Sequence, residues 1–226
     1  MSFFVTGIDT AVGKTHVATQ LLLAARAAGL RCAGMKPICC GDRADAEQLL
    51  AASSDGLTID EVNPIWFKTP AAPFAASLIE QTTVNEKALI DRLRDLEKRF
   101  EVVVVEGVGG WLVPIRANFY VSDLAAKMGL PVLIIAMNRL GCLNHTMLTV
   151  QGVKSAGLVC AGVVMNELHA VSDIATNTNI EVLRKLIDVP VLPVPLAGDL
   201  TPKWMEVLGI RVSPSGASSV VHGTHV

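Results

Sequence analysis

The sequence predicts an α/β fold in which one mostly parallel β-sheet carries helices on both faces. Short β-branched segments alternate with helical patterns along the chain, and this alternation is typical of strands joined by right-handed helical crossovers. One segment, Val102–Val105, is continuously apolar, as strands buried on both faces usually are. Because 51% of the 226 residues are hydrophobic but only 4% are aromatic, we expect an aliphatic core.

The first expected elements surround a glycine-rich turn. Phe3–Thr6 indicates a strand, and a helix is expected from about Lys14 to Ala28, with Gly29 at its C-cap. The remaining expected elements, in chain order, are a strand over 31–35, a helix over 45–53, a proline-punctuated loop over 60–72, a helix over 85–99, the strand over 102–105, a helix over 120–128, a strand over 132–136, a helix over 144–156, a strand over 161–165, a helix over 173–187 and a strand over 189–194.

Length, charge and cysteine content narrow the class of protein. We expect one domain over 1–212 and a poorly ordered Ser/Gly-rich tail over 213–226. A net charge of −2 argues against nucleic acid or an anionic membrane as a partner. The five cysteines lack metal-ligand spacing, and neither a signal peptide nor a membrane-spanning run is visible. A reduced, cytoplasmic protein is therefore expected.

The richest motif is the segment Gly7–Thr15, between the first expected strand and the first expected helix. A turn ending at a helix N-terminus presents backbone N–H groups to phosphate oxygens. In such a P-loop, Gly13 permits close approach, Lys14 reaches the terminal phosphates and Thr15 binds Mg²⁺. The predicted fold is therefore of P-loop NTPase type. Five residues rather than the usual four separate the two glycines, so a turn that binds nothing remains an alternative.

Three further charged residues are candidates for the same site. Glu106 follows the most hydrophobic strand, at the sheet edge where α/β proteins bind ligands. Its alternative role is simply to end the strand, although a carboxylate beside a buried strand requires a cation partner. Asp45 begins a helix and could equally serve as its N-terminal cap. Lys36 ends the second strand, where a lysine could also extend to the solvent.

Several segments together carry a family resemblance: Val5–Thr15, Gly34–Pro37, Val62–Pro64, Val105–Trp111 and Leu140–His145. Over roughly residues 3–200 the chain resembles the dethiobiotin synthetases. The five-residue spacing of the loop and the Glu-Gly-x-Gly-Gly-Trp segment are specific as a pair, because either alone indicates only a P-loop protein. The extra residue after Gly7 is the form that this family uses.

The resemblance implies a homodimeric enzyme of biotin synthesis with its active site at the subunit interface. The substrate would be 7,8-diaminononanoate, of which one amine captures carbon dioxide (supplied as bicarbonate) as a carbamate. ATP, with Mg²⁺, phosphorylates the carbamate, and the second amine then closes the ureido ring and expels phosphate. Such an enzyme acts chiefly by positioning groups and offsetting negative charge.

The resemblance also implies roles for individual residues. Catalysis is assigned to Lys36, Lys14 and Thr10, and the Mg²⁺ ligands are Thr15, Asp45 and Glu106, directly or through water. The nucleotide contacts are Ala11, Val12, Gly13, Lys14, Thr15, His16, Asp45, Glu106, Gly107, Val108, Gly109, Asn166, Glu167, Pro195, Leu196 and Ala197, of which Asn166 reads the adenine edge. The substrate contacts are Thr10, Lys36, Cys40 and Gly109, with Gly141, Cys142, Leu143 and Asn144 of the partner subunit binding the distal carboxylate.

The sequence departs from the family pattern at a few positions. Cys40 stands where a serine commonly contacts the substrate, and a thiol is the weaker hydrogen-bond donor. Leu192–Pro195 replaces the usual Gly-Glu-Ile-Pro of the base pocket, which leaves the strictness of ATP selection open.

Three alternatives remain. A cobyrinic acid diamide synthetase usually carries an amidotransferase domain, for which this chain has no room. A partitioning ATPase has a second lysine early in its phosphate loop, and residues 7–12 contain none. A non-catalytic nucleotide-binding module is the third.

Overall fold

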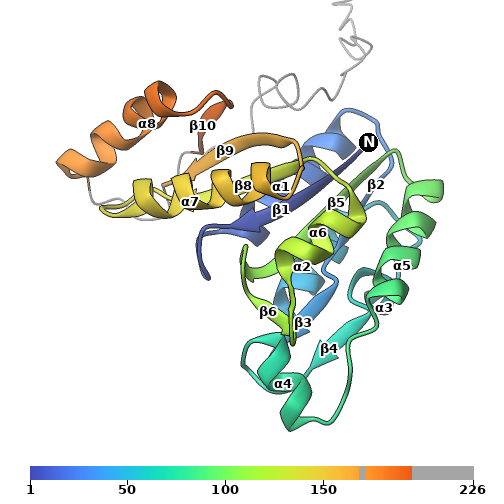
Figure 1. Ribbon diagram of the computed structural model, residues 1–226. Helices are drawn as coiled ribbons and strands as arrows, with labels where there is room; N and C mark the ends of the chain where they lie inside the picture. Colours follow the sequence, from blue (N-terminus) through green and yellow to red (C-terminus); the bar gives the residue numbers. More distant parts are fainter. Residues whose placement is uncertain (168–171, 195–226) are drawn as a thin grey trace, which may run out of the picture.

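A computed structural model describes residues 1–167 and 172–194, and its centre is a six-stranded parallel sheet (Figure 1). The strand order is β10-β9-β8-β1-β5-β2. The strands are β1 Ser2–Gly7, β2 Cys32–Met35, β5 Val102–Gly110, β8 Val132–Met137, β9 Cys160–Asn166 and β10 Val191–Val194, and the helices beside them are α1 Lys14–Ala27, α2 Ala44–Ala52, α5 Glu86–Arg99, α6 Val121–Met128, α7 Cys142–Ser155 and α8 Ile174–Leu186. The predicted fold class is confirmed, and apart from β5 each predicted boundary agrees to within two residues.

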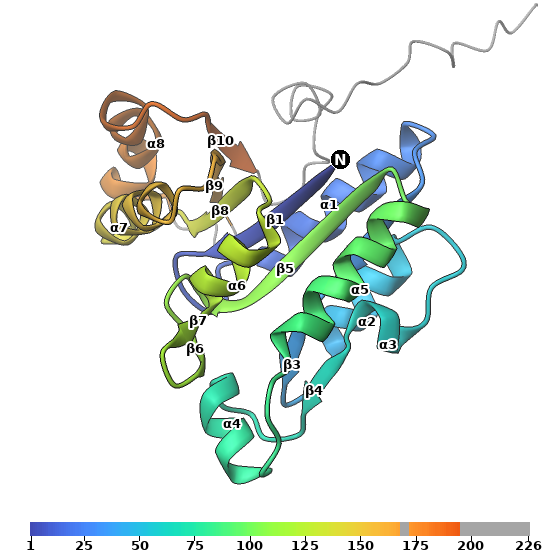
Figure 2. The same cartoon turned by 45° about the vertical axis from the view of Figure 1, so that its right-hand side comes forward.

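The two faces of the sheet are covered by different helices because neighbouring strand residues point to opposite sides. In β1, Phe3 and Val5 belong to the apolar cluster that includes Leu21 of α1 and Leu49 of α2. Phe4 belongs to the opposite cluster, with apolar residues of α5, α6 and α7. Figure 2 shows α1 and α2 on one side of the sheet and α5 and α6 on the other.

The strand predicted over 102–105 ends later than expected, because β5 continues to Gly110. Its glycine-rich end still pairs with β1, where Gly7 lies opposite Gly110. A Cβ atom at Gly107 would lie 3.1 Å from the ring of Phe4, so any larger residue there would require the aromatic ring to shift. Glu106 therefore lies inside a strand rather than at its end.

The predicted loop over 60–72 is also partly wrong. It contains most of α3 (Ile59–Val62) and the strand β4 (Ile65–Phe67), which pairs in parallel with β3 (Ile38–Cys40). Helix α4 (Pro73–Ile79) follows and lies with β3 and β4 beyond the carboxyl end of β2 in both views (Figures 1 and 2). These elements are too short for their hydrophobic period to be recognised, and prolines obscure them further.

A short hairpin of β6 (Pro114–Arg116) and β7 (Phe119–Tyr120) follows the glycine-rich end of β5. No helix among the described residues is long and apolar enough to cross a membrane. The predicted tail over 213–226, and with it the end of the domain at residue 212, lies outside the described residues.

Candidate active site

The phosphate loop connects β1 to α1 at the carboxyl edge of the sheet. Gly13 is the N-cap of α1 with a φ of 90°, and no side chain caps the first turn of this helix. The backbone N–H groups of that turn are therefore available to an anion. Gly7 is equally constrained, because a Cβ atom there would lie 2.6 Å from the carbonyl oxygen of Asp9. Ala11 adopts a φ of 56°, an uncommon conformation for a residue with a side chain.

Lys14 begins α1 and folds back over the loop. Its side chain is buried, and its Nζ donates to the carbonyl oxygen of Asp9 at 3.2 Å. Burial, assisted by the charge of Lys36, lowers the pKa of Lys14 to about 8. No carboxylate lies within ion-pairing distance of this ammonium among the described residues. Phosphate oxygens would supply the counter-charge that it lacks.

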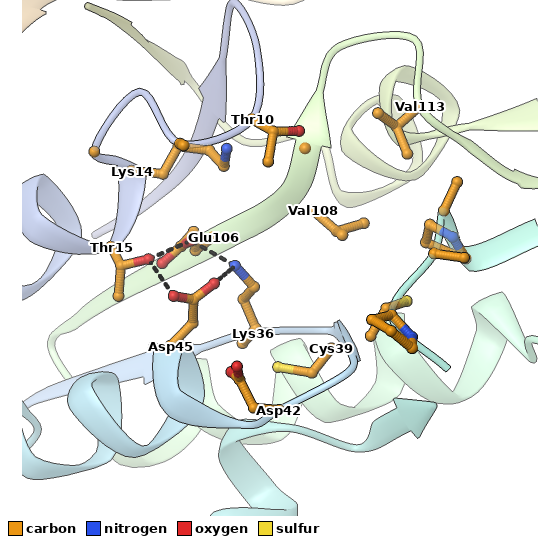
Figure 3. Close-up of a pocket in the computed structure, with 18 residues that line it drawn as sticks. Thr10, Lys14, Thr15, Lys36, Cys39, Asp42, Asp45, Glu106, Val108 and Val113 are labelled. Atoms are coloured by element: carbon orange, nitrogen blue, oxygen red, sulfur yellow. Dashed lines mark hydrogen bonds and ion pairs between the residues drawn. The ribbon is translucent and has the colours of Figure 1, made fainter. Parts of the chain in front are cut away.

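Lys36 lies at the centre of a charge cluster formed with the buried Glu106 and the half-exposed Asp45 (Figure 3). Its Nζ is 2.5 Å from Oε1 of Glu106 and 2.7 Å from Oδ2 of Asp45. Lys36 is 3% exposed and Glu106 is fully buried. Burial acts to lower the pKa of Lys36, but the two carboxylates outweigh it and raise the pKa above its usual value. For Asp45, likewise, burial acts to raise the pKa, but Lys36 outweighs it and the net pKa is lowered.

Thr15 completes this cluster from the first turn of α1. Its Oγ1 lies 2.9 Å from Oδ1 of Asp45 and 2.9 Å from Oε1 of Glu106. A hydroxyl can donate only one hydrogen, so at least one of these oxygens gains no bond from it. Oε2 of Glu106 is buried and has no partner within the described residues. The cluster thus has spare oxygen donors of the kind that Mg²⁺ prefers.

A group of three or more His, Cys, Asp and Glu side chains suited to a metal ion is absent from the described part of the chain. The cluster at Thr15 does not belong to that class, because it combines two carboxylates with a hydroxyl. A loop hydroxyl with a carboxylate is the combination that binds Mg²⁺ in P-loop proteins, and this cluster contains a second carboxylate in addition.

A cavity of about 630 Å³ lies between the phosphate loop and the β3–β4–α4 region. The predicted site residues that line it are Thr10, Ala11, Gly13, Lys14, Thr15, Lys36, Cys40, Asp45, Glu106, Val108 and Gly109. Val12, His16 and Gly107 do not line it. The structure adds lining residues that the sequence reasoning missed, namely Cys39, Asp42, Pro70, Ala71, Ala72, Pro73 and Val113. The proline cluster at 70–73 was the available signal, but it indicated only a loop.

Cys40 lies at the wall of this cavity and is partly buried. Burial, with a contribution from Glu80, raises the pKa of its thiol to about 11. The neighbouring Cys39 is more deeply buried, and burial raises its pKa to about 12. Both groups are therefore neutral thiols at physiological pH, which makes them weak hydrogen-bond donors.

The predicted base-pocket residues are only partly described. Asn166 is buried at the end of β9, and its Nδ2 donates to the carbonyl oxygen of Val12 at 3.0 Å. It thereby connects β9 to the phosphate loop. Glu167 donates its backbone N–H to the carbonyl oxygen of Val194. Pro195, Leu196 and Ala197 lie outside the described residues.

The segment Gly141–Asn144 forms the N-terminus of α7, which begins at Cys142 rather than at the predicted residue 144. Gly141 is the N-cap with a φ of 88°, and no side chain caps the first turn. None of the four residues lines the cavity at Lys36. A second cavity of about 360 Å³ lies between Trp111 and the α7 residues His145, Leu148 and Thr149. Thr10 lines both cavities.

The chain as a whole has recognisable relatives. A family model described as an AAA domain matches residues 1–203. The chain is 43% identical over 191 residues to the ATP-dependent dethiobiotin synthetase BioD of Akkermansia muciniphila, which covers 84% of this chain and 90% of that protein. It is 42% identical over 217 residues to the enzyme of the same name from Anaeromyxobacter dehalogenans, with 92% and 97% covered.

Solved structures agree on the fold. The septum site-determining protein MinD of Pyrococcus horikoshii, complexed with Mg-ADP, superposes with a TM-score of 0.56 at 15% identity, covering 92% of this chain and 85% of that one. The receptor FtsY of Elizabethkingia anophelis in complex with GDP gives a TM-score of 0.51 at 16% identity, covering 84% and 55%. At this identity the likeness supports the P-loop α/β fold alone.

Proposed function

The chain belongs to the ATP-dependent dethiobiotin synthetase family, and we propose that it uses ATP and carbon dioxide to close a cyclic urea on 7,8-diaminononanoate. The observation that carries the proposal is the meeting at one cavity of an open phosphate loop with a charge cluster, in which buried Lys36 and Glu106 meet the half-exposed Asp45. A nucleotide whose phosphates lie on the loop would direct its terminal phosphate toward this cluster.

The reaction balances as a condensation driven by ATP. One amine of the substrate attacks carbon dioxide and loses a proton, which gives a carbamate. A carbamate oxygen attacks the γ-phosphorus, and the bond to the β-phosphate oxygen breaks to release ADP. The second amine attacks the carbonyl carbon of the resulting mixed anhydride, loses a proton and expels inorganic phosphate as the ring closes.

The lysines would stabilise the charge that develops along this route. Among the residues that the structure describes, Lys14 has no carboxylate partner, so its ammonium would be available to the β- and γ-phosphates. Lys36 enters the same cavity from the opposite side. It would contact the carbamate and the transferring phosphoryl group, where a fixed cation is most effective.

We propose that Thr15, Asp45 and Glu106 hold Mg²⁺, which would neutralise charge on the phosphates when bound. The unpartnered Oε2 of Glu106 supports this assignment, since a buried carboxylate oxygen without a donor is costly. Lys36 now supplies the positive charge between the two carboxylates. To reach the substrate, its ammonium must leave them, and a cation at the same carboxylates would compensate for that departure.

Homodimer formation, with the diamine bound between subunits, and a cytoplasmic location belong to the same proposal. The uncapped N-terminus of α7 can receive a carboxylate. It does not line the cavity at Lys36 of its own chain. It would therefore serve the cavity of the partner subunit, where it would bind the distal carboxylate of the substrate.

The decisive test is the dependence of phosphate release on both co-substrates. The purified protein with Mg²⁺-ATP should release phosphate only when diaminononanoate and bicarbonate are both present, and mass spectrometry should detect the ureido product. A nucleotide-switched ATPase would instead hydrolyse ATP without the diamine. Diamine-independent hydrolysis, or the absence of a ureido product, would reject the synthetase function.

Replacement of the central lysine tests its assigned role. Lys36→Ala should reduce turnover by roughly two orders of magnitude or more, as loss of an electrostatic catalytic group does, while the circular dichroism spectrum is retained. Full activity in this variant would remove Lys36 from the catalytic set.

A further inference from the structure

Asn63 follows α3 and is 1% exposed, yet it does not line either cavity. Its Nδ2 donates to the carbonyl oxygens of Lys36 and Ile65, both at 2.8 Å. Its Oδ1 accepts a hydrogen bond from Nε of Arg43 at 3.0 Å. Two carbonyl oxygens on one side and a guanidinium on the other allow only this orientation of the amide. Asn63 is thus a fully satisfied buried amide that joins three separate segments.

Arg43 connects Asn63 to the beginning of α2. It is the N-cap of that helix, two residues before Asp45. Its NH2 group donates to the carbonyl oxygen of Asn63 and to the carboxylate of Asp60, both at 2.9 Å. Its guanidinium also lies over the ring of Trp66, 5.1 Å from the centroid. The side chain is 15% exposed, so it is held in one position by contacts on several sides.

The backbone of Lys36 is fixed from the same segment. Its N–H donates to the carbonyl oxygen of Val62 at 2.8 Å, and its carbonyl oxygen accepts from Asn63. Residues 36 and 45 are therefore anchored to one point through Asn63, one directly and the other through Arg43. The charge cluster requires Lys36 and Asp45 to meet at 2.7 Å, and the anchor lies outside that cluster.

We propose that Asn63, with Arg43, is a positioning residue that sets the placement of Lys36 relative to Asp45 for the transfer of the phosphoryl group. Neither residue contacts residues 7–15 in the part of the chain that the structure describes, so we expect a substitution there to affect phosphoryl transfer more than the binding of nucleotide to the phosphate loop. The inference rests on the proposed synthetase function. It assigns a role to the Val62–Pro64 segment that the cavity alone does not explain.

The test is the separate effect of substitution on turnover and on ATP affinity. Asn63→Asp keeps the shape and the acceptor for Arg43 but directs a carboxylate oxygen at the carbonyl oxygens of Lys36 and Ile65. A displacement of Lys36 by about 1 Å should reduce kcat by roughly 100-fold, while KM for ATP changes less than about threefold. Steady-state kinetics with saturating diamine and bicarbonate measure both quantities.

A second variant and a matched control keep the test decisive. Arg43→Met preserves an unbranched side chain over Trp66 and should reduce kcat in the same direction but less, even if Asn63→Asp fails to fold. Asn85→Ala removes the side-chain cap of α5, remote from the site. It should lower the melting temperature without lowering kcat.

The possible outcomes distinguish failure of the positioning role of Asn63 and Arg43 from failure of the proposed synthetase function. Unchanged kcat in a folded Asn63→Asp or Arg43→Met, or a parallel rise of KM for ATP, overturns the positioning role while wild-type turnover remains. The same loss of kcat in Asn85→Ala overturns it too, since general destabilisation would then suffice. Absence of ureido product from the wild-type protein overturns the proposed function itself.

Discussion

The ammonium of Lys36 lies between the carboxylates of Asp45 and Glu106, the two residues to which we assign Mg²⁺ in the proposed function. Its ammonium lies within 2.7 Å of both carboxylates, and Glu106 has no access to water. The lysine therefore stabilises the site before any metal binds. Under the proposed function, Lys36 would compete with Mg²⁺ for these carboxylates as well as act on the substrate.

Lys36→Met should destabilise the protein without Mg²⁺ and make it responsive to the ion. Leaving a buried carboxylate without its partner costs about 3–5 kcal/mol, and Mg²⁺ would replace the lost charge. The melting temperature of the variant should fall and then recover when Mg²⁺ is added without nucleotide. The wild-type protein should respond much less. A variant whose melting temperature does not change when Mg²⁺ is added would contradict the placement of the ion at these carboxylates.

The thiol of Cys40 should react slowly at neutral pH. Its pKa is raised by burial from near 9 to about 11, and only the thiolate is alkylated rapidly. Alkylation of Cys40 by iodoacetamide, followed by peptide mass spectrometry, should accelerate about tenfold per pH unit from pH 7 to pH 10. In the denatured protein the same rate should level off near pH 9. Levelling near pH 9 in the folded protein as well would show that burial does not perturb this thiol.

At the scale of elements, α7 packs closely against Trp111 at the end of β5 because Gly152 of the helix has no side chain. A Cβ atom at Gly152 would lie 2.7 Å from Nε1 of Trp111. Trp111 follows β5 directly and is 7% exposed. The close approach fixes the position of the helix whose N-terminus is assigned to the substrate carboxylate.

Gly152→Ala should therefore destabilise the protein, although alanine normally favours a helix by about 1 kcal/mol over glycine. Overpacking against the indole should cost about 1–3 kcal/mol, and urea unfolding monitored by fluorescence measures the difference. Gln151→Ala, at the exposed neighbouring position, should change stability by less than about 0.5 kcal/mol. A stabilised Gly152→Ala would show that the helix can shift freely.

Long buried elements could be predicted from the sequence, and short ones could not. The six parallel strands and the helices between them have apolar patterns long enough to recognise. The three-residue strands β3 and β4 are instead stabilised by pairing with each other and by the hydrogen bonds from Asn63 to the carbonyl oxygens of Lys36 and Ile65. The end of β5 was missed because glycines normally indicate turns, whereas here they permit contact with Phe4.

At the scale of the whole molecule, the residues of the candidate site could be predicted from the sequence, but their mutual contacts could not. The phosphate loop, Lys36, Asp45 and Glu106 were all predicted, because motif positions and strand ends converge at one edge of a parallel sheet. The direct contact between Lys36 and both carboxylates was not predicted, since it depends on side-chain directions across three elements. The wall formed by residues 70–73 was missed because α4 approaches β6 only in the folded chain.

The proposed dimer can be tested on the exposed face beside the second cavity. Leu112 and Leu148 line that cavity and are 68% and 59% exposed, which is unusual for large apolar side chains near each other. Analytical ultracentrifugation should give twice the mass of the chain. Leu148→Glu should yield monomers that bind ATP but make little ureido product. A fully active monomer would rule out a shared active site.

The order of strands in the sheet also has a consequence for folding during translation. Phe4 of β1 pairs with Val105 on one side and with Val132 on the other. At translation rates of roughly 5–20 residues per second, the first strand waits on the order of 10 s for its second neighbour to leave the ribosome. During that interval an apolar segment with unpaired edges is exposed to association with other chains. Ribosome-arrested chains should accordingly resist protease only after β8 has emerged from the exit tunnel.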